Sequence, residues 1–289
     1  MILLKNLKKI IFTFLRLVFY SYFISNNRKK KFTLDIKKFQ FFLKKRINFS
    51  FSRFSDGELF VLQNKKLIIS KNFWILENKK RKAKFSESER KTFLPSKHQF
   101  YRKKLLESLK FEKKNYFKGI SCKCCNGLGD YNYMIGLVKS HKELTFSNLL
   151  QNGNYPTYIK KILPLFKKKK VILIVNKSAT ITSLPFDVKK RFNIGKNCFI
   201  NNYGIIKKIK NYIKKNSIRN HVFLISASSL SNLIIFELYK EFDDNTYIDI
   251  GSTLNYYFTH RKKNQSRSYL EEYWNNKRVI QFQNRYCYW

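Results

Sequence analysis

The amino-acid sequence predicts an α/β fold, with a mostly parallel sheet flanked by helices. The continuous apolar run at residues 171–176 is typical of a strand that is buried on both faces, and the largely apolar residues 221–227 and 247–251 are further candidate strands. Between them, residues 205–215 and 231–242 repeat apolar side chains at helical spacing. The alternation of strands and helices indicates parallel pairing through helical crossovers, so we expect a Rossmann-like arrangement.

The other helices and strands are predicted from shorter and less regular patterns. Residues 33–46 have a helical pattern, and residues 47–54 alternate apolar and polar side chains as a strand does. Asp56 and Gly57 follow that strand directly and are typical of a turn or loop. Residues 197–202 are a further candidate strand, and the lysine-rich residues 77–115 have a helical pattern. Ligands of parallel α/β sheets bind outside the carboxyl ends of the strands, so we expect the site there.

The composition is strongly basic. The chain has 289 residues and a formal net charge of +42, from 60 lysines and arginines against 18 aspartates and glutamates. Such a charge attracts polyanions, so a basic nucleic-acid-binding protein without catalysis is the alternative class. The lysines are spread through every segment, and no helix-turn-helix or zinc-finger pattern occurs. The abundance of Lys, Asn, Ile, Phe and Tyr is typical of an AT-rich genome, so we expect no specific nucleic-acid partner.

Residues 1–30 have the pattern of a basic amphipathic helix, ahead of one domain at residues 31–289. The apolar run at residues 10–24 is interrupted by Arg16 and is short for a membrane-spanning helix. A basic stripe on an apolar helix suits a membrane surface, and the basic run at residues 27–31 would face anionic headgroups. We therefore expect a cytoplasmic protein that is peripheral at the inner face of the membrane. A first helix packed on the domain is the alternative.

One short stretch gathers charged residues in a chain with few carboxylates. Arg53, Asp56 and Glu58 lie within six positions, and Gly57 permits the backbone to bend between the two acids. Two carboxylates that converge on one point suit Mg²⁺ or Mn²⁺, which bind hard oxygen ligands together with substrate phosphates. The planar guanidinium of Arg53 suits a phosphate. The spacing alone favours an ordinary solvated turn.

The same residues carry a resemblance to a known family. Residues 51–59, FSRFSDGEL, are similar to the Arg-Phe-Gly-Asp-Gly-Glu stretch of the GT-D glycosyltransferases, which have an Asp-x-Glu motif. Further segments resemble that family in the same order and extend the likeness over about residues 45–275. These segments are residues 116–126, 145–155, 171–179, 221–238, 247–258 and 265–270.

The resemblance implies an α/β fold of the GT-D type and a metal-dependent glycosyltransferase of the hexosyltransferase class. It implies a nucleoside-diphosphate sugar as donor and a saccharide or glycolipid as acceptor, in the synthesis of a cell-surface polysaccharide. Mn²⁺ or Mg²⁺ would be the cofactor, held by Asp56 and Glu58. We expect Asp56, Glu58 and Asp249 to be catalytic, and the expected donor-binding residues are Arg53, Gly57, Asn148, Asn152, Asn154, Asn176, Ser228 and Gly251.

A base or an orienting carboxylate is needed for the acceptor hydroxyl, and the remaining acids supply the candidates. Asp249 lies at the end of a predicted strand, where ligands bind; the alternative is a structural acid that caps the following loop. Asp130 is a second candidate, for which a plain turn is the alternative. The chain departs from the family where Ser55 replaces a glycine, where Ser228 and Ser229 replace a Gly-Pro pair, and where Asn255 replaces a frequent acid.

Overall fold

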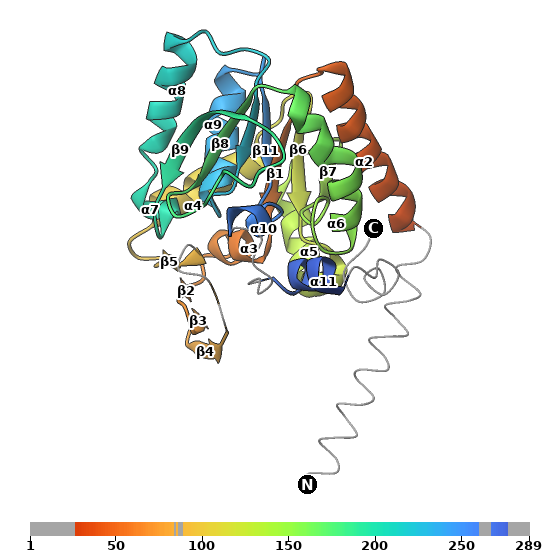
Figure 1. Ribbon diagram of the computed structural model, residues 1–289. Helices are drawn as coiled ribbons and strands as arrows, with labels where there is room; N and C mark the ends of the chain where they lie inside the picture. The colour runs from red at the N-terminus through yellow and green to blue at the C-terminus, as the bar shows by residue number, and fades with distance from the viewer. Residues whose placement is uncertain (1–26, 84, 86–88, 260–266, 277–289) are drawn as a thin grey trace.

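The computed structural model describes residues 27–83, 85, 89–259 and 267–276. The predicted α/β class is confirmed, because a sheet of seven strands forms the centre of the molecule and helices flank it (Figure 1). The strands follow the order β7-β6-β1-β11-β10-β8-β9, and each neighbouring pair is parallel. The sheet is therefore wholly parallel, and β1 and β11 are neighbours near its middle.

The apolar runs expected from the sequence form strands of this sheet. β8 shows why such a run lacks alternation: Val171, Leu173 and Val175 pack into one core, and Ile172 and Ile174 pack into the core on the other face. The strands are β1 (Ser50–Phe54), β6 (Tyr116–Ile120), β7 (Leu144–Phe146), β8 (Val171–Asn176), β9 (Val188–Ile194), β10 (Val222–Ile225) and β11 (Thr246–Asp249).

Each face of the sheet has its own apolar core under a layer of helices. The core on one face receives side chains from α2 (Asn27–Lys45), α6 (Tyr155–Thr157), η3 (Tyr158–Ile162), η4 (Leu163–Lys168), α10 (Asn255–Phe258) and α11 (Ser268–Asn276), and η2 (Asn152–Asn154) leads into α6. The core on the other face receives side chains from α3 (Asp56–Leu62), α4 (Gln99–Lys110), α5 (Lys123–Leu137), α7 (Cys198–Asn201), α8 (Ile205–Lys215) and α9 (Leu230–Glu241). The helices predicted over residues 205–215 and 231–242 are α8 and α9.

A second, antiparallel sheet was not predicted from the sequence. Its four strands follow the order β4-β3-β2-β5. In Figure 1 it lies below the large sheet, on the same side as α3 and α10, which follow β1 and β11. Its strands are β2 (Leu67–Ile69), β3 (Phe73–Leu76), β4 (Lys79–Lys82) and β5 (Lys91–Phe93).

Three local predictions were wrong. The helical pattern at residues 77–115 is interrupted by β4 and β5, and of that range α4 forms the helix. The turn expected at residues 56–57 is the start of α3, and the Ser55 N–H donates to Glu58 Oε2 at 3.0 Å. This is half of the capping box that a Ser-x-x-Glu sequence favours, so the helix start outweighs the turn. The strand expected at residues 197–202 is the short helix α7, which follows Asn197 in a left-handed conformation with φ 47°.

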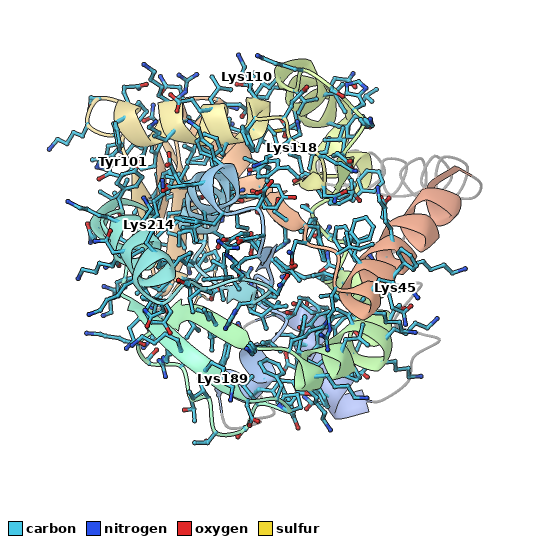
Figure 2. All side chains as sticks on the ribbon, turned by 90° about the horizontal axis from the view of Figure 1, so that it is seen from above. Lys45, Tyr101, Lys110, Lys118, Lys189 and Lys214 are labelled. Carbon is cyan, nitrogen blue, oxygen red and sulfur yellow. The ribbon has the colours of Figure 1, made fainter. Side chains whose placement is uncertain are left out.

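The N-terminal helix expected at residues 1–30 lies mostly outside the described residues. The boundary expected between residues 30 and 31 falls within α2, which begins at Asn27 in the described part. None of the helices that the structure describes is long and apolar enough to cross a membrane. Nitrogen-tipped side chains surround the molecule in the view from above (Figure 2), in keeping with lysines spread over the whole sequence.

Candidate active site

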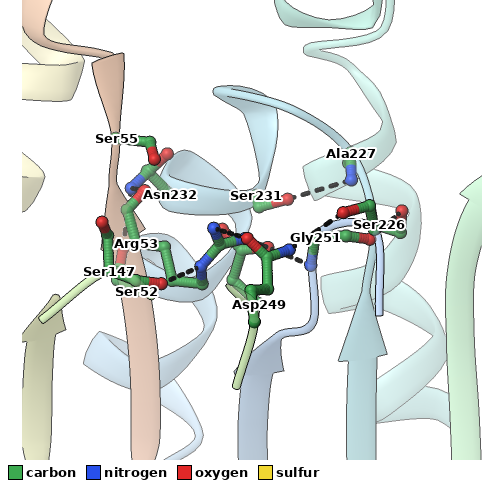
Figure 3. A network of polar contacts seen from close by, with 12 residues as sticks. Ser52, Arg53, Ser55, Ser147, Ser226, Ala227, Ser231, Asn232, Asp249 and Gly251 are labelled. Atoms are coloured by element: carbon green, nitrogen blue, oxygen red, sulfur yellow. Dashed lines mark hydrogen bonds and ion pairs between the residues drawn. The ribbon is translucent and has the colours of Figure 1, made fainter. Parts of the chain in front are cut away.

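Polar side chains from several elements meet at the carboxyl ends of the central strands (Figure 3). β1 and β11 lie side by side, and the pairing of Phe51 with Ile248 brings Arg53 and Asp249 to neighbouring strand ends. The loops after β7, β10 and β11 add Ser147, Ser226 and Gly251. This edge is where ligands of parallel α/β sheets bind, so it is the candidate active site.

Arg53 is held in a fixed position within this cluster. It is 8% exposed, its Nε donates to the Ser147 carbonyl at 2.6 Å, and its Nη2 donates to Gln151 Oε1 at 2.5 Å. Its Nη1 lies 3.7 Å from Asp249 Oδ1. These two hydrogen bonds use two of the five N–H groups of a guanidinium. The other N–H groups are oriented by the protein and are suited to a phosphate.

Asp249 is a buried carboxyl with a raised pKa. It is 5% exposed, and its Oδ1 accepts a hydrogen bond from the Gly251 N–H at 2.9 Å. Burial raises the pKa of Asp249 to about 7, although the charge of Arg53 and the hydrogen bond from Gly251 oppose that rise. A carboxyl that titrates near neutral pH suits a general base. The hydrogen bond from the Gly251 N–H also means that Asp249 caps the loop after β11, which is the structural role given above as the alternative.

Gly251 lies directly against Arg53. Its φ is +48°, in the left-handed region that favours glycine. A Cβ at this position would overlap the guanidinium of Arg53 and the amide nitrogen of Gln151. The close approach of this backbone is therefore what lets Arg53, Gln151 and Asp249 share one small space.

Glu58 faces the interior and belongs to a buried polar cluster. It is 7% exposed, and its Oε1 accepts hydrogen bonds from the Ser229 hydroxyl and, at 3.4 Å, from Lys91 Nζ. The same Nζ donates to the Gly57 carbonyl at 3.2 Å. Burial alone would raise the pKa of Glu58, but the charge of Lys91 and the hydrogen bonds hold that pKa below its usual value. Glu58 is therefore ionised, and it ties α3 to β5 and to the loop before α9.

Asp56 lies on the exposed side of the same helix. Its Oδ1 accepts the N–H of the next residue, Gly57, at 2.9 Å. Asp56 is exposed whereas Glu58 is buried. Side chains two positions apart in an α-helix point roughly 200° apart around its axis, so these carboxylates do not converge as a bent loop would allow.

That geometry bears on how a divalent cation would fit. In the described part of the chain, no group of three or more His, Cys, Asp and Glu side chains could hold a metal ion. The described residues therefore do not form a metal site from protein ligands alone. Mg²⁺ usually binds one or two carboxylates together with substrate phosphates, and the exposed Asp56 fits that arrangement. That Glu58 shares the cation stays a prediction.

Three of the four asparagines expected at the donor, Asn148, Asn152 and Asn154, lie between β7 and α6. Asn154 is fully buried and donates from Nδ2 to the Asn148 carbonyl at 2.9 Å. Asn152 is half-buried and has a left-handed φ of 49°. The same loop supplies Ser147 and Gln151, which hold Arg53. Asn148 and Asn154 therefore shape the loop that positions the arginine.

Three further predicted residues have local roles in the structure. Asn176 ends β8, and its Oδ1 accepts hydrogen bonds from the Ser178 N–H at 3.0 Å and from the Ser178 hydroxyl at 2.8 Å. Ser228 is exposed and left-handed with φ 49°, a conformation that favours glycine. Asp130 accepts a hydrogen bond from Gln63 Nε2 at 2.9 Å and so joins α5 to the end of α3.

Several residues of this region were missed from the sequence. Asn232 of α9 is fully buried and donates to the Ser52 hydroxyl at 3.0 Å and to the Arg53 carbonyl at 2.8 Å (Figure 3). Lys91 had no feature that set it apart from the many other lysines. Ser147 binds Arg53 through its backbone carbonyl, and every residue type has such a carbonyl, so the sequence could not indicate this contact. Gln151, Ser226 and Ser229 also belong to this region and were not predicted as site residues, although Ser229 was noted as a departure from the family.

The fold and this cluster define a wholly parallel α/β domain whose polar site lies between two central strands. Comparison with solved structures finds the same fold. The chain aligns with "A New Glycosyltransferase (DUF1792) from Streptococcus sanguinis" at a TM-score of 0.50 and 13% identity, over 80% of this chain and 86% of that chain. This likeness confirms the fold type expected from the motifs.

A second solved structure is less similar. It is described as "The highly conserved domain of unknown function 1792 has a distinct glycosyltransferase fold", and it aligns at a TM-score of 0.47 and 12% identity, over 78% of this chain and 81% of that chain. No model of a known protein family and no curated protein matches the sequence.

Proposed function

We propose that the protein is a glycosyltransferase that moves a sugar from a nucleoside-diphosphate sugar to a saccharide or glycolipid acceptor. The observation that carries the proposal is the buried pair of Arg53 and Asp249 at the carboxyl ends of the central strands. The pair offers a cation for a diphosphate beside a carboxyl that titrates near neutral pH. The shared fold with a described glycosyltransferase supports the proposal by analogy. The motifs suggest a role in cell-surface polysaccharide synthesis.

The donor diphosphate gains negative charge as the sugar leaves it. Arg53 would stabilise that charge through the N–H groups that donate to neither Ser147 nor Gln151, which include Nη1 beside Asp249. Because the guanidinium is already fixed, little reorganisation is needed during the reaction. Of the other donor residues, Gly57, Asn152 and Ser228 are at least partly exposed and would contact the donor directly.

The acceptor hydroxyl must lose its proton as its oxygen attacks the sugar. In our proposal the ionised carboxylate of Asp249 accepts that proton. The new bond joins the acceptor oxygen to the anomeric carbon, and the bond between that carbon and the diphosphate oxygen breaks. The nearby charge of Arg53 favours the ionised carboxylate that this step requires.

A divalent cation, Mn²⁺ or Mg²⁺, belongs to the proposal. When bound, it would neutralise part of the charge on the leaving diphosphate. Asp56, the exposed acid of the pair, would bind it together with the donor phosphates. Glu58 would keep the first turn of α3 in place through its contacts with Lys91 and Ser229.

Binding of nucleoside diphosphates tests this proposal. We would titrate a panel of them by calorimetry, with and without Mn²⁺, into wild type, Asp56→Asn and Asp187→Asn. Asp187 is an exposed acid just before β9 and serves as the matched control. We expect Mn²⁺ to strengthen binding in wild type and in Asp187→Asn, and to have no effect in Asp56→Asn. If binding were the same with and without Mn²⁺ and in all three proteins, the basic surface would be binding phosphate non-specifically.

We further propose that the protein works at the inner face of the membrane. The support is the basic and apolar sequence of residues 1–30. Sedimentation with anionic vesicles would compare the full chain with a chain that lacks residues 1–26. Loss of vesicle binding in the shorter chain is the expected result, and retained binding would assign the attraction to the overall charge.

A further inference from the structure

A hollow with a volume of about 520 Å³ lies at the amino ends of β6 and β7, whereas the candidate active site lies at the carboxyl ends of the strands. Figure 2 views the molecule from this side, and in that projection Lys118 lies nearer the centre than the exposed Lys110 and Lys45. The charged residues that define the hollow include Lys38, Lys113, Lys114, Lys118, Lys142 and Glu143.

The charge of the hollow is positive. Its lining includes five lysines and two glutamates. Lys38 lies 3.6 Å from Glu143, and Lys113 forms an ion pair with Asp243 at 2.8 Å. In the described part of the chain, the ammonium groups of Lys114 and Lys142 are exposed and have no acidic partner within ion-pair distance. The hollow therefore has more cationic groups than its own acids can neutralise.

Lys118 of β6 distinguishes this hollow from the rest of the basic surface. It is 2% exposed, and its Nζ donates one long hydrogen bond, to the Phe111 carbonyl at 3.3 Å. An ammonium has three N–H donors, so two have no partner among the described residues. Burial lowers the pKa of Lys118, and the charges of Glu112 and Glu143 partly oppose that effect.

A buried ammonium with unused donors is costly unless an anion or a polar group pairs with it. Lys118 lines the hollow, so a ligand in the hollow is within reach of those donors. The volume lies within the range of pockets that hold small molecules, which is about 300–1,000 Å³. Phosphate groups offer several acceptor oxygens and more than one negative charge, which is what a group of ammonium ions binds best.

We propose that this hollow is a second binding site, for a small phosphate-bearing molecule, with Lys118 as its buried anchor and Lys114 and Lys142 at its mouth. The site is separate from Arg53 and Asp249 and does not depend on the proposed transferase activity. A ligand there contacts the connection between α4 and β6 and the segment before β7.

Calorimetry with inorganic pyrophosphate, on the full chain at about 0.15 M salt, tests this site. The variants are Lys118→Met and the double variant Lys114→Gln/Lys142→Gln. The control is the double variant Lys110→Gln/Lys189→Gln, which removes the same charge from exposed lysines. We expect saturable binding that weakens about tenfold or more in the first two and stays unchanged in the control. Equal loss in the control would overturn the proposal, since net charge alone would then explain binding.

Two further measurements keep the test decisive. Pyrophosphate should raise the melting temperature of wild type but not that of Lys118→Met, so a folded variant that does not respond supports the anchor role. Arg53→Gln should bind pyrophosphate at this site as wild type does. Binding that is lost in Arg53→Gln and kept in Lys118→Met would assign the anion to the candidate active site and refute the second site.

Discussion

At the scale of single residues, Gly251 has the tightest surroundings of the described glycines, because a side chain there would occupy the space of Arg53 and Gln151. Gly251→Ala should destabilise the fold by about 1–3 kcal/mol and weaken nucleoside-diphosphate binding by displacing Arg53. Urea denaturation and calorimetry measure the two effects.

The matched control for this substitution is Gly136→Ala in α5. A Cβ at Gly136 meets no atom within 4 Å, and the residue lies in a helix. The control should therefore raise stability by about 0.5–1 kcal/mol. If Gly251→Ala bound nucleotide as wild type does, the assigned position of Arg53 at the donor would be wrong.

Asp249 should make stability depend on pH. The pKa of an aspartate in an unfolded chain is about 3.9, and burial raises the folded value of Asp249 to about 7. Between these values the folded state retains a proton that the unfolded state has lost. The contribution of Asp249 to stability is therefore present below about pH 4 and is lost as the pH rises through about 7.

Asp249→Asn removes this titration. Relative to wild type, the variant should gain stability between about pH 5 and about pH 7.5, measured as the change in the free energy of unfolding. Turnover by wild type should rise over the same range, because the proton acceptor must be ionised. If the difference in the free energy of unfolding between wild type and Asp249→Asn were the same at about pH 5 and about pH 7.5, this carboxyl would not titrate near pH 7.

Some site residues were predictable because they follow recognisable strands. Asp249 and Gly251 lie at the end of the strand predicted at residues 247–251, and Arg53 lies within an alternating strand. Lys91 was not predictable, since its burial depends on a small sheet that meets α3 only in the folded chain. Ser147 acts through its backbone, so its residue type carries no information.

At the scale of elements, the contact between α3 and β5 depends on the buried pair of Glu58 and Lys91. Lys91→Met alone leaves Glu58 buried without its partner and should cost about 3–5 kcal/mol. The double variant Glu58→Gln/Lys91→Met should recover part of that loss, because no unpaired charge remains. Urea denaturation of the two single variants and the double variant gives the coupling energy.

The partly exposed pair of Lys104 and Glu107 in α4 is the control cycle. Its coupling energy should be below about 1 kcal/mol. A coupling between Glu58 and Lys91 as small as that of the control would contradict their role in holding the first turn of α3.

Elements that cross the buried centre were predictable because burial on both faces leaves a continuous apolar run, as in β8 and β10. The small sheet was not, since β4 is a run of exposed basic residues with no apolar alternation. The start of α3 was misread because Asp-Gly is a strong turn indicator. The Ser-x-x-Glu sequence at residues 55–58 is a helix-start pattern, and it predicts the observed start of α3.

At the scale of the whole molecule, a net charge of +42 gives the surface a general attraction for anions. Binding to double-stranded DNA should fall steeply between about 50 and 200 mM salt and show no sequence preference. Fluorescence anisotropy with several duplexes measures both properties. A duplex that retained tight binding at the higher salt would favour the nucleic-acid-binding class instead.

The central claim is that Arg53 and Asp249 form the catalytic centre of a glycosyltransferase. The most direct test is the release of nucleoside diphosphate from a panel of nucleotide sugars, with Mn²⁺, by wild type, Arg53→Lys and the control Lys189→Arg. We expect turnover of at least one donor by wild type and by the control, and about a hundredfold slower turnover by Arg53→Lys. Turnover of no donor, or equal turnover in Arg53→Lys, would contradict the claim.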